Sequence, residues 1–375
     1  MEDPGLLRRI AFAHIKGIDL DKARHLADIT GGVDAFFDMP VRQLWQLIGA
    51  QKEFCSDSAR AHCIDSAAAE LPFLAKNSVD ALFYDNPAYP HRLLECDDAP
   101  ALLYRLGRCD LNARHVVSIV GTRRATAYGC KFTADLVAAL AERLEGLVIV
   151  SGLAYGIDVA AHQAALKAGV PTVAVVAHGL RTLYPADHRD IARRIVSSGG
   201  AIVTEYPSGA PVHRGNFLAR NRIVAGMADA LVMVESDAKG GAMVTASIAA
   251  AYNRDVFAVP GRVTDRYSRG ANALIHNNKA AMLRDADDLI EAMNWQTRPT
   301  PGEQTSFDFA PAADPQLTPG QQLIVDHLRR NPDDTLSDIA NALAVPYRTI
   351  AARVMEMEMD DILAILPGGA IQLNI

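Results

Sequence analysis

The amino-acid sequence predicts an α/β protein whose central part is a doubly wound, mostly parallel sheet. Three observations predict it. Six short segments rich in Val, Ile and Ala are apolar on both faces, as are strands buried under helices on each side. Helical segments of about 10–15 residues separate most of them, which gives crossover connections and parallel pairing. Loops with glycines and basic side chains follow the strand ends, where such folds bind ligands.

Residues 1–75 are expected to form a small helical domain before the sheet. Four short segments have apolar residues at helical spacing: Leu6–His14, Leu20–Ala27, Val33–Phe37 and Val41–Leu47. The turn at Gly17 is similar to that of a helix-hairpin-helix, which holds DNA phosphate on backbone N–H groups, but Asp19 and Asp21 follow it and repel phosphate. DNA contact and a packing or interaction role therefore both stay open for this domain.

The sheet domain is expected over residues 80–293. Its predicted strands are Val116–Val120, Leu147–Val150, Thr172–Ala177, Ala201–Thr204, Ala230–Val234 and Val256–Val259. The carboxyl ends of parallel strands lie at one edge of a sheet, so the loops after these strands are expected to converge on one face.

Residues 294–317 are rich in Pro, Thr and Gln and have little periodicity, which is typical of a linker. Residues 318–375 then contain three predicted helices and a hairpin, which together make a winged helix. The helices are Gly320–Arg330, Thr335–Leu343 and Pro346–Met359, and the hairpin strands are Ile362–Leu366 and Ala370–Ile375. Thr335 and Asp338 have the spacing of a helix capping box.

Charge is unevenly distributed along the chain. The 37 basic and 44 acidic side chains give a net charge of −7, which taken alone argues against nucleic acid as a partner. Residues 1–110 have 12 basic and 17 acidic side chains (−5), residues 111–270 have 18 and 12 (+6), and residues 271–375 have 7 and 15 (−8). The basic region coincides with the predicted sheet, so the two acidic ends are not expected to be principal DNA contacts.

No motif in the sequence indicates a metal or another cofactor. The five cysteines are dispersed and form no C-x-x-C pair, so neither a zinc site nor a redox motif is supported. No apolar run approaches the roughly 18 residues of a membrane helix, and the first residues lack the apolar segment of a signal peptide. A cytoplasmic protein without cofactor is expected.

The loop after the first predicted strand contains Gly121, Thr122, Arg123 and Arg124. It has neither the G-x-G-x-x-G of dinucleotide sites nor the G-K-[ST] of a P-loop, which disfavours a standard NAD enzyme or an ATPase. Backbone N–H groups at the next helix and bidentate guanidiniums are suited to a phosphate. The alternative is that these arginines pair with carboxylates on neighbouring loops.

Cations also surround an aromatic ring after the fourth predicted strand, where Arg214, Phe217, Arg220, Asn221 and Arg222 follow one another closely. This combination suits a single strand, because guanidiniums bind phosphates and a ring stacks on a base. Alternatively, Arg220 and Arg222 point in different directions and one of them braces the loop. The other candidates for nucleic-acid binding lie in the remaining strand-end loops: Gly152, Gly156, Lys239, Gly240, Gly241, Thr245 and Arg269.

Asp158 and His162 lie one helical turn apart after the second predicted strand. Asp158 is placed to cap the helix and hold the loop, and the two side chains are close enough in sequence to share a hydrogen bond. A catalytic dyad needs a nucleophile, and none stands at a suitable spacing. Structural bracing is therefore the predicted role of both residues, and no catalytic residue is predicted.

Six motifs occur in one order along the chain: SIVGTRRATAYG, SGLAYGIDVAAHQAAL, the YP of GLRTLYPADH, FLARNRIVAG, GGAMVTA and FAVPG. As a set they closely resemble the DNA-processing protein A (DprA/Smf) family. The resemblance covers roughly residues 80–290, and both ends look more loosely like the family's SAM-like and winged-helix modules. The family's glycine-serine-arginine turn corresponds to Gly121, Thr122 and Arg123, where the threonine keeps the hydroxyl, and its Arg-Asn-Arg corresponds to Arg220–Arg222.

The resemblance implies an extended Rossmann-like domain that binds single-stranded DNA without sequence preference. It also implies loading of a RecA-type recombinase on that DNA during DNA uptake, natural transformation and recombination, and a homodimer formed through the same domain. On this basis the protein is expected to be a recombination mediator and not an enzyme.

Two other functions are each suggested by one segment of the sequence. A nucleotide phosphoribohydrolase-like enzyme of a related Rossmann family has a G-G-x-G-T-x-x-E pattern with a catalytic glutamate, and the segment from Gly240 to Ser247 has no such glutamate. A regulator that reads duplex DNA through the winged helix needs a basic third helix. That helix has Arg348 and Arg353, but also Glu356 and Glu358, which fits a protein-facing role better.

Overall fold

The computed structural model describes residues 4–297, 317–332, 334–360, 362–365 and 370–373. The chain divides into two compact units, Met1–Arg298 and Pro299–Ile375. Most of the predicted linker lies outside the described residues. The predicted boundary between the helical and the sheet domain falls inside the first unit, and the domain boundaries stay predictions.

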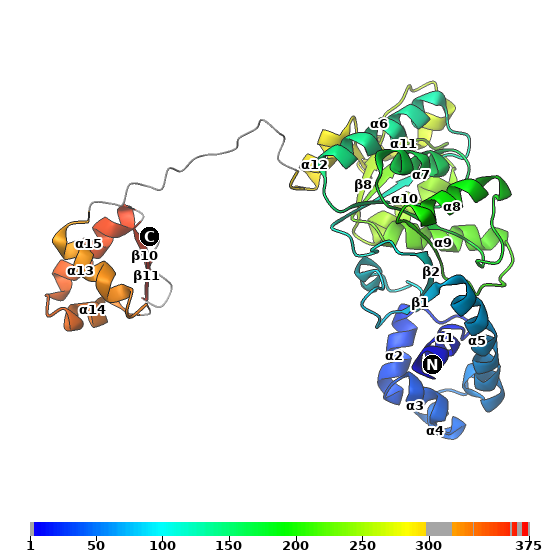
Figure 1. The fold of residues 1–375 in the computed structure, drawn as a ribbon, viewed down its shortest axis with the longest axis horizontal. Helices are drawn as coiled ribbons and strands as arrows, with labels where there is room; N and C mark the ends of the chain where they lie inside the picture. Colours follow the sequence, from blue (N-terminus) through cyan, green and yellow to red (C-terminus); the bar gives the residue numbers. More distant parts are fainter. Residues whose placement is uncertain (1–3, 298–316, 333, 361, 366–369, 374–375) are drawn as a thin grey trace. The chain divides into compact units, whose positions relative to one another are not determined.

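A nine-stranded sheet forms the centre of the first unit (Figure 1), in the order β1-β2-β6-β5-β4-β3-β7-β8-β9. Its strands are β1 (Val79–Phe83), β2 (Leu102–Gly107), β3 (His115–Val120), β4 (Leu147–Ser151), β5 (Thr172–Val175), β6 (Ala201–Thr204), β7 (Ala230–Met233), β8 (Asp255–Ala258) and β9 (Ala281–Met282). The strands from β6 to β9 in this order pair in parallel, whereas β2 pairs antiparallel with both β1 and β6. The predicted doubly wound, mostly parallel sheet is therefore confirmed.

All six predicted strands are present, with β5, β7 and β8 ending one or two residues earlier than expected. Every residue of β3 is buried, as its apolar sequence indicates. Val117 and Ile119 face one hydrophobic cluster, and Val116 and Val120 face the other. Three strands were not predicted: β1 and the two-residue β9, which form the two edges of the sheet, and β2, which lies next to β1.

Helices cover both faces of the sheet. One face packs against α6 (Ala127–Arg143), α7 (Ile157–Ala168), α8 (Arg189–Ser197) and α12 (Ala286–Ala292). The other face packs against α9 (Arg214–Gly226), α10 (Gly241–Ala251) and α11 (Arg269–His276). Four short 3-10 helices complete the unit: η1 (Glu53–Cys55), η2 (His91–Glu95), η3 (Ala186–His188) and η4 (Arg266–Ser268).

The chain winds from β3 through β4 and β5 to β6 on one side and then returns to β7 and β8 on the other side. The neighbours β3 and β7 are therefore the topological switch point of the sheet. In such folds a crevice opens at the carboxyl ends of the two strands whose connections diverge, and ligands bind there. The loops that follow Val120 and Met233 border this crevice.

Five helices precede the sheet and pack on its β1–β2 edge through one hydrophobic cluster: α1 (Pro4–Ala13), α2 (Leu20–Thr30), α3 (Val33–Asp38), α4 (Val41–Ile48) and α5 (Asp57–Asn77). The prediction of short helices throughout this region is wrong for α5, which has 21 residues. The buried residues of α5 include the polar Arg60 and Glu70, several of its alanines are exposed, and Pro72 lies inside it, so its sequence lacks a strong helical period. At the Gly17 turn, the Lys22 ammonium donates to the Gly17 carbonyl and the Asp19 carboxylate.

The second unit contains α13 (Pro319–Leu328), α14 (Leu336–Ala342) and α15 (Tyr347–Met359), followed by the antiparallel strands β10 (Leu363–Ile365) and β11 (Ile371–Leu373). These are the three helices and the hairpin that the sequence predicts, and they share one core. The predicted capping box is present, with the Asp338 carboxylate accepting from the Thr335 backbone N–H and hydroxyl. The turn Pro367-Gly368-Gly369 lies outside the described residues.

Candidate functional site

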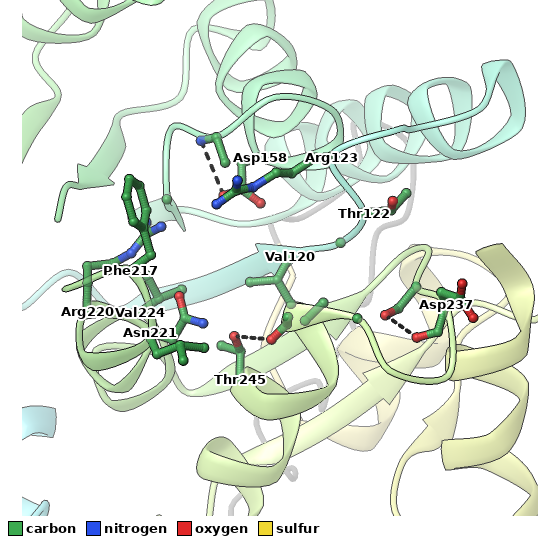
Figure 2. Close-up of a pocket in the computed structure, with 18 residues that line it drawn as sticks. Val120, Thr122, Arg123, Asp158, Phe217, Arg220, Asn221, Val224, Asp237 and Thr245 are labelled. Carbon is green, nitrogen blue, oxygen red and sulfur yellow. Dashed lines mark hydrogen bonds between the residues drawn. The ribbon is translucent and has the colours of Figure 1, made fainter. Parts of the chain in front are cut away.

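A cavity of about 250 Å³ lies in the crevice at the switch point of the sheet. The loops after β3, β4 and β7 line it, together with α9 and the amino-terminal end of α10 (Figure 2). Eleven residues singled out from the sequence meet there: Gly121, Thr122, Arg123, Gly152, Asp158, Phe217, Arg220, Asn221, Gly240, Gly241 and Thr245. The predicted convergence is therefore confirmed for the loops after β3, β4 and β7.

Two glycines allow the loops around the cavity to approach one another. A Cβ at Gly152 would overlap the Arg220 guanidinium. Gly156 has a φ of +78°, and a Cβ there would overlap the Thr122 carbonyl oxygen. The backbone N–H of Ile157 donates to that same carbonyl, which ties the start of α7 to the loop after β3. Only glycine fits at both positions without moving a neighbour.

Arg220 lies beneath the Gly152 loop and is only 4% exposed. Its Nη1 donates to the Val175 carbonyl at 2.6 Å, and its Nε has no hydrogen-bond partner among the described residues. Burial lowers the pKa of Arg220, since a guanidinium loses hydration there. A buried cation with donors to spare and one side on a cavity is suited to binding an anion.

Asp158 lines the same cavity and is also buried. Burial raises the pKa of its carboxyl group, and the positive charges of Arg220 and Arg123 partly oppose this shift. Its Oδ2 accepts from the Ala154 backbone N–H at 3.4 Å. This contact holds the loop after β4, as predicted. The predicted helix cap is wrong, because Asp158 lies inside α7, whose N-cap is Gly156.

His162 does not hydrogen-bond to Asp158. Its Nδ1 lies 2.8 Å from the Thr172 Oγ1, which donates its own proton to the Ile149 carbonyl. Nδ1 must therefore be the donor, and this fixes the tautomer of the ring. Burial lowers the pKa of His162 to about 3, so the ring is neutral near pH 7.

An aromatic and basic groove continues from the cavity. The Arg123 guanidinium lies 5.4 Å from the centroid of the Phe217 ring, and the Tyr184 ring packs edge-on against Phe217 at 5.6 Å. The groove is lined by Arg123, Tyr184, Val212, Arg214, Phe217 and Leu218, three of which also line the cavity. Figure 2 shows Arg123 and Phe217 at the rim of the cavity.

Tyr184 was not singled out as a site residue. It is 42% exposed and belongs to the loop after β5. An aromatic side chain in the loop after a predicted strand could have indicated it, because such a ring can stack on a base. The fold places it beside Phe217, which lies 33 positions further along the chain.

Arg222 lies outside the cavity. Its Nη2 donates to the Glu205 Oε2 at 2.6 Å, and both side chains are mostly buried, at 18% and 15% exposed. Arg220 faces the cavity and Arg222 faces Glu205. The two arginines therefore point in different directions, as the alternative interpretation of the sequence states.

Arg124, Lys239 and Arg269 are exposed and line neither the cavity nor the groove. Their contact with nucleic acid stays a prediction. Two negative results complete the description of the site. Among the described residues, no group of three or more His, Cys, Asp or Glu side chains is arranged to hold a metal ion. No helix in the described part of the chain is long and apolar enough to span a membrane.

A sequence profile of the DNA recombination-mediator protein A family matches residues 80–294, which is more than half of the chain and includes every residue of the cavity. The putative DNA processing protein DprA of Mycobacterium tuberculosis is 40% identical over 262 residues, covering 66% of this chain and 64% of that protein. Protein Smf of Synechocystis is 40% identical over 205 residues, covering 54% and 51%. The chain thus spans less than two thirds of the length of these two relatives.

Protein Smf of Escherichia coli is 28% identical over 373 residues, which cover 98% of this chain and 95% of that protein. The solved structure of DNA processing protein A from Streptococcus pneumoniae matches with a TM-score of 0.63 at 28% identity, over 76% of this chain and 97% of that one. The structure of the Helicobacter pylori protein, described in terms of its single-stranded DNA binding mode, matches with a TM-score of 0.52 at 30% identity. That match covers 58% of this chain and 95% of that one.

Proposed function

The chain belongs to the DNA recombination-mediator protein A family, and from this premise we propose that its cavity and groove bind single-stranded DNA without sequence preference. One observation carries the proposal. The buried guanidinium of Arg220 has a donor without a partner among the described residues, and it lies at a cavity that continues into an aromatic groove. The Helicobacter pylori relative, described as binding single-stranded DNA, supports the choice of ligand.

In this proposal the cavity binds a phosphate. Arg220 contributes its buried guanidinium, and Arg123 contributes an exposed one at the rim. The amino-terminal end of α10, at Gly240 and Gly241, adds the positive end of a helix dipole. An anion in this position would supply the hydrogen-bond acceptor that the Arg220 Nε lacks.

The groove binds a base. Phe217 and Tyr184 present ring faces or edges beside the cations Arg123 and Arg214. Stacking on an aromatic ring is tolerant of sequence, because every base has a π-face. A double helix keeps its bases paired and stacked inside, so a site of this kind favours single strands.

We further propose that the protein acts as a recombination mediator that loads a RecA-type recombinase on the bound strand during DNA uptake, natural transformation and recombination. It would do so in the cytoplasm as a homodimer formed through the sheet domain, because two sites on one strand raise avidity. Binding, and not catalysis, is its proposed mode of action, and no cofactor is required for it.

A fluorescence-anisotropy titration of the full chain with labelled oligonucleotides tests this proposal. Thymine-only and mixed-sequence single strands should bind about equally, and blunt duplex should bind more weakly. With three phosphates held by Arg123, Arg214 and Arg220, the slope of log affinity against log salt should be about −2, since each single-strand phosphate contributes about −0.7. A slope near zero, or a preference for duplex, would contradict it.

Two further measurements test recombinase loading and the enzyme alternative. Filament formation by a RecA-type recombinase on strands coated with single-strand-binding protein should be faster with the full chain than without it. Release of free base from nucleoside monophosphates, if abolished by changing Gly240 and Gly241, would instead support the enzyme alternative.

A further inference from the structure

The helix α15 of the second unit is apolar on two sides. Ile350, Val354 and Met357 face the core of the unit and are fully buried. Tyr347, Met355 and Met359 are 54%, 65% and 88% exposed. The alanines at 351 and 352 lie between them along the helix, and Ala352 is exposed as well. At about 100° per residue, Met355 and Met359 share one exposed face with Ala352, whereas Tyr347 lies about 120° around the helix from Met359. Exposed apolar side chains along one helix face mark an interaction surface.

Charge along this exposed face is divided between the two halves of the helix. Arg348 lies on this face in the amino-terminal half, and Glu356 borders it in the carboxyl-terminal half. Asp360 is the C-cap residue that follows the helix. None of these three side chains forms an ion pair with another described residue. The Arg353 guanidinium packs over Gly320 of α13 and does not belong to this face. An acidic end and a single exposed arginine are poorly suited to duplex phosphates.

We infer that α15 pairs with α15 of a second copy of this chain in antiparallel orientation. A two-fold axis near the middle of the helix places Arg348 of each copy beside the acidic end, Glu356 and Asp360, of the other copy. The same axis lays Met355 beside Ala352 of the facing helix, whose small side chain permits close approach. A parallel pair would instead place like charges together, so the charge pattern selects the antiparallel arrangement.

This pairing is a secondary contact and not the main source of dimerisation. A stable interface buries at least about 1,200 Å² in total, and a single helix of this length offers less. The helices should therefore associate mainly when two chains are already held close together, for example on one DNA strand, because tethering raises their effective concentration.

Cysteine cross-linking in the full chain tests the pairing. The Ala352→Cys variant, treated with a short bismaleimide, should give covalent dimers well above the background of the parent chain, whose Cys130 is exposed. The matched control is Asn341→Cys, which adds an equally exposed cysteine on α14 away from the proposed contact. Equal cross-linking at the two positions would overturn the inference.

Charge reversal in the Ala352→Cys background tests the orientation. Arg348→Glu should lower the cross-linking yield about tenfold, because two attractions become two repulsions and a factor of ten needs only about 1.4 kcal/mol. Adding Glu356→Arg and Asp360→Arg should restore the yield, which also shows that the helix still folds. Arg329→Glu, the same charge change at the C-cap of α13, should have no effect. A yield that is insensitive to Arg348→Glu, or that the combined reversal does not restore, would overturn the antiparallel pairing.

Discussion

Arg220→Gln and Arg222→Gln should affect different properties of the protein. The first should weaken DNA binding, and the second should lower the free energy of unfolding. The two residues lie two positions apart on α9, where side chains face different directions. Arg220 lines the cavity and has a donor without a partner among the described residues, whereas Arg222 is paired with Glu205. The first is therefore expected to contact the ligand and the second to hold the structure.

The magnitudes follow from these contacts. Arg220→Gln removes one charged hydrogen bond to phosphate, worth about 1.5–3 kcal/mol, and should weaken binding by about 10- to 150-fold. It should also bring the salt slope closer to zero by about 0.7. Arg220→Gln also loses the hydrogen bond to the Val175 carbonyl, but it removes a buried charge that the fold disfavours. The two effects oppose each other, so the free energy of unfolding should fall less than it does for Arg222→Gln.

Arg222→Gln leaves the mostly buried Glu205 without its ion-pair partner. Removing one member of a buried pair costs about 3–5 kcal/mol of stability, and the residual exposure of both side chains favours the lower end of that range. The salt slope should not change, because no phosphate contact is lost.

The assay combines two measurements on each variant. Anisotropy titrations with a thymine-only single strand over a range of salt concentrations give the affinity and the slope, and urea denaturation gives the free energy of unfolding. The reasoning fails if Arg222→Gln reduces the slope while Arg220→Gln leaves it unchanged, or if Arg220→Gln destabilises the fold as much as Arg222→Gln does.

Three further changes probe the surroundings of Arg220. Gly152→Ala should weaken single-strand binding at least about tenfold, because its Cβ would displace the Arg220 guanidinium. Gly209→Ala is the control, since a Cβ there meets open space. Equal binding by the two variants would count against the proposed site. Asp158→Asn should reduce the pH dependence of binding. Burial raises the pKa of Asp158, and its carboxylate opposes a bound phosphate only in the ionised form. A pH profile of affinity that superimposes on that of the parent would contradict this. His162→Gln should remove an acid-sensitive loss of stability. The unfolded histidine binds a proton below about pH 6.5 and the folded one only near pH 3, so stability is lost as the pH falls between these values, and the stability difference between parent and variant should change by about 1.4 kcal/mol per pH unit.

The central strands could be predicted from sequence because burial on both faces leaves a continuous apolar segment. Every residue of β3, β4 and β6 is buried, and the predicted bounds nearly coincide with those in the structure. The strands β1 and β2 carry no such signal. Asp80 and Arg105 are paired with each other across this antiparallel edge, so polar residues interrupt both segments.

The candidate site could be predicted only as a set of loops. Chain order places Arg214, Arg220 and Arg222 together, but their partners come from elsewhere. Glu205 and the Val175 carbonyl lie 17 and 45 positions away from the arginines that they contact. Packing of α9 against the sheet decides which guanidinium reaches which partner, and local spacing does not contain that information.

Regional net charge is a weaker guide to the binding face than the distribution of ion pairs. The excess of six positive charges over residues 111–270 includes arginines whose charge is already matched. Arg143 and Arg254 pair with carboxylates outside the region, which its net charge does not count. Arg222 pairs with Glu205 inside the region, so these two charges already cancel. The described residues around the cavity and groove instead include Arg123 and Arg214, which form no ion pair with another described residue. Unpaired cations attract phosphate most strongly, so the salt slope should count these arginines and Arg220, and not the net charge of the domain.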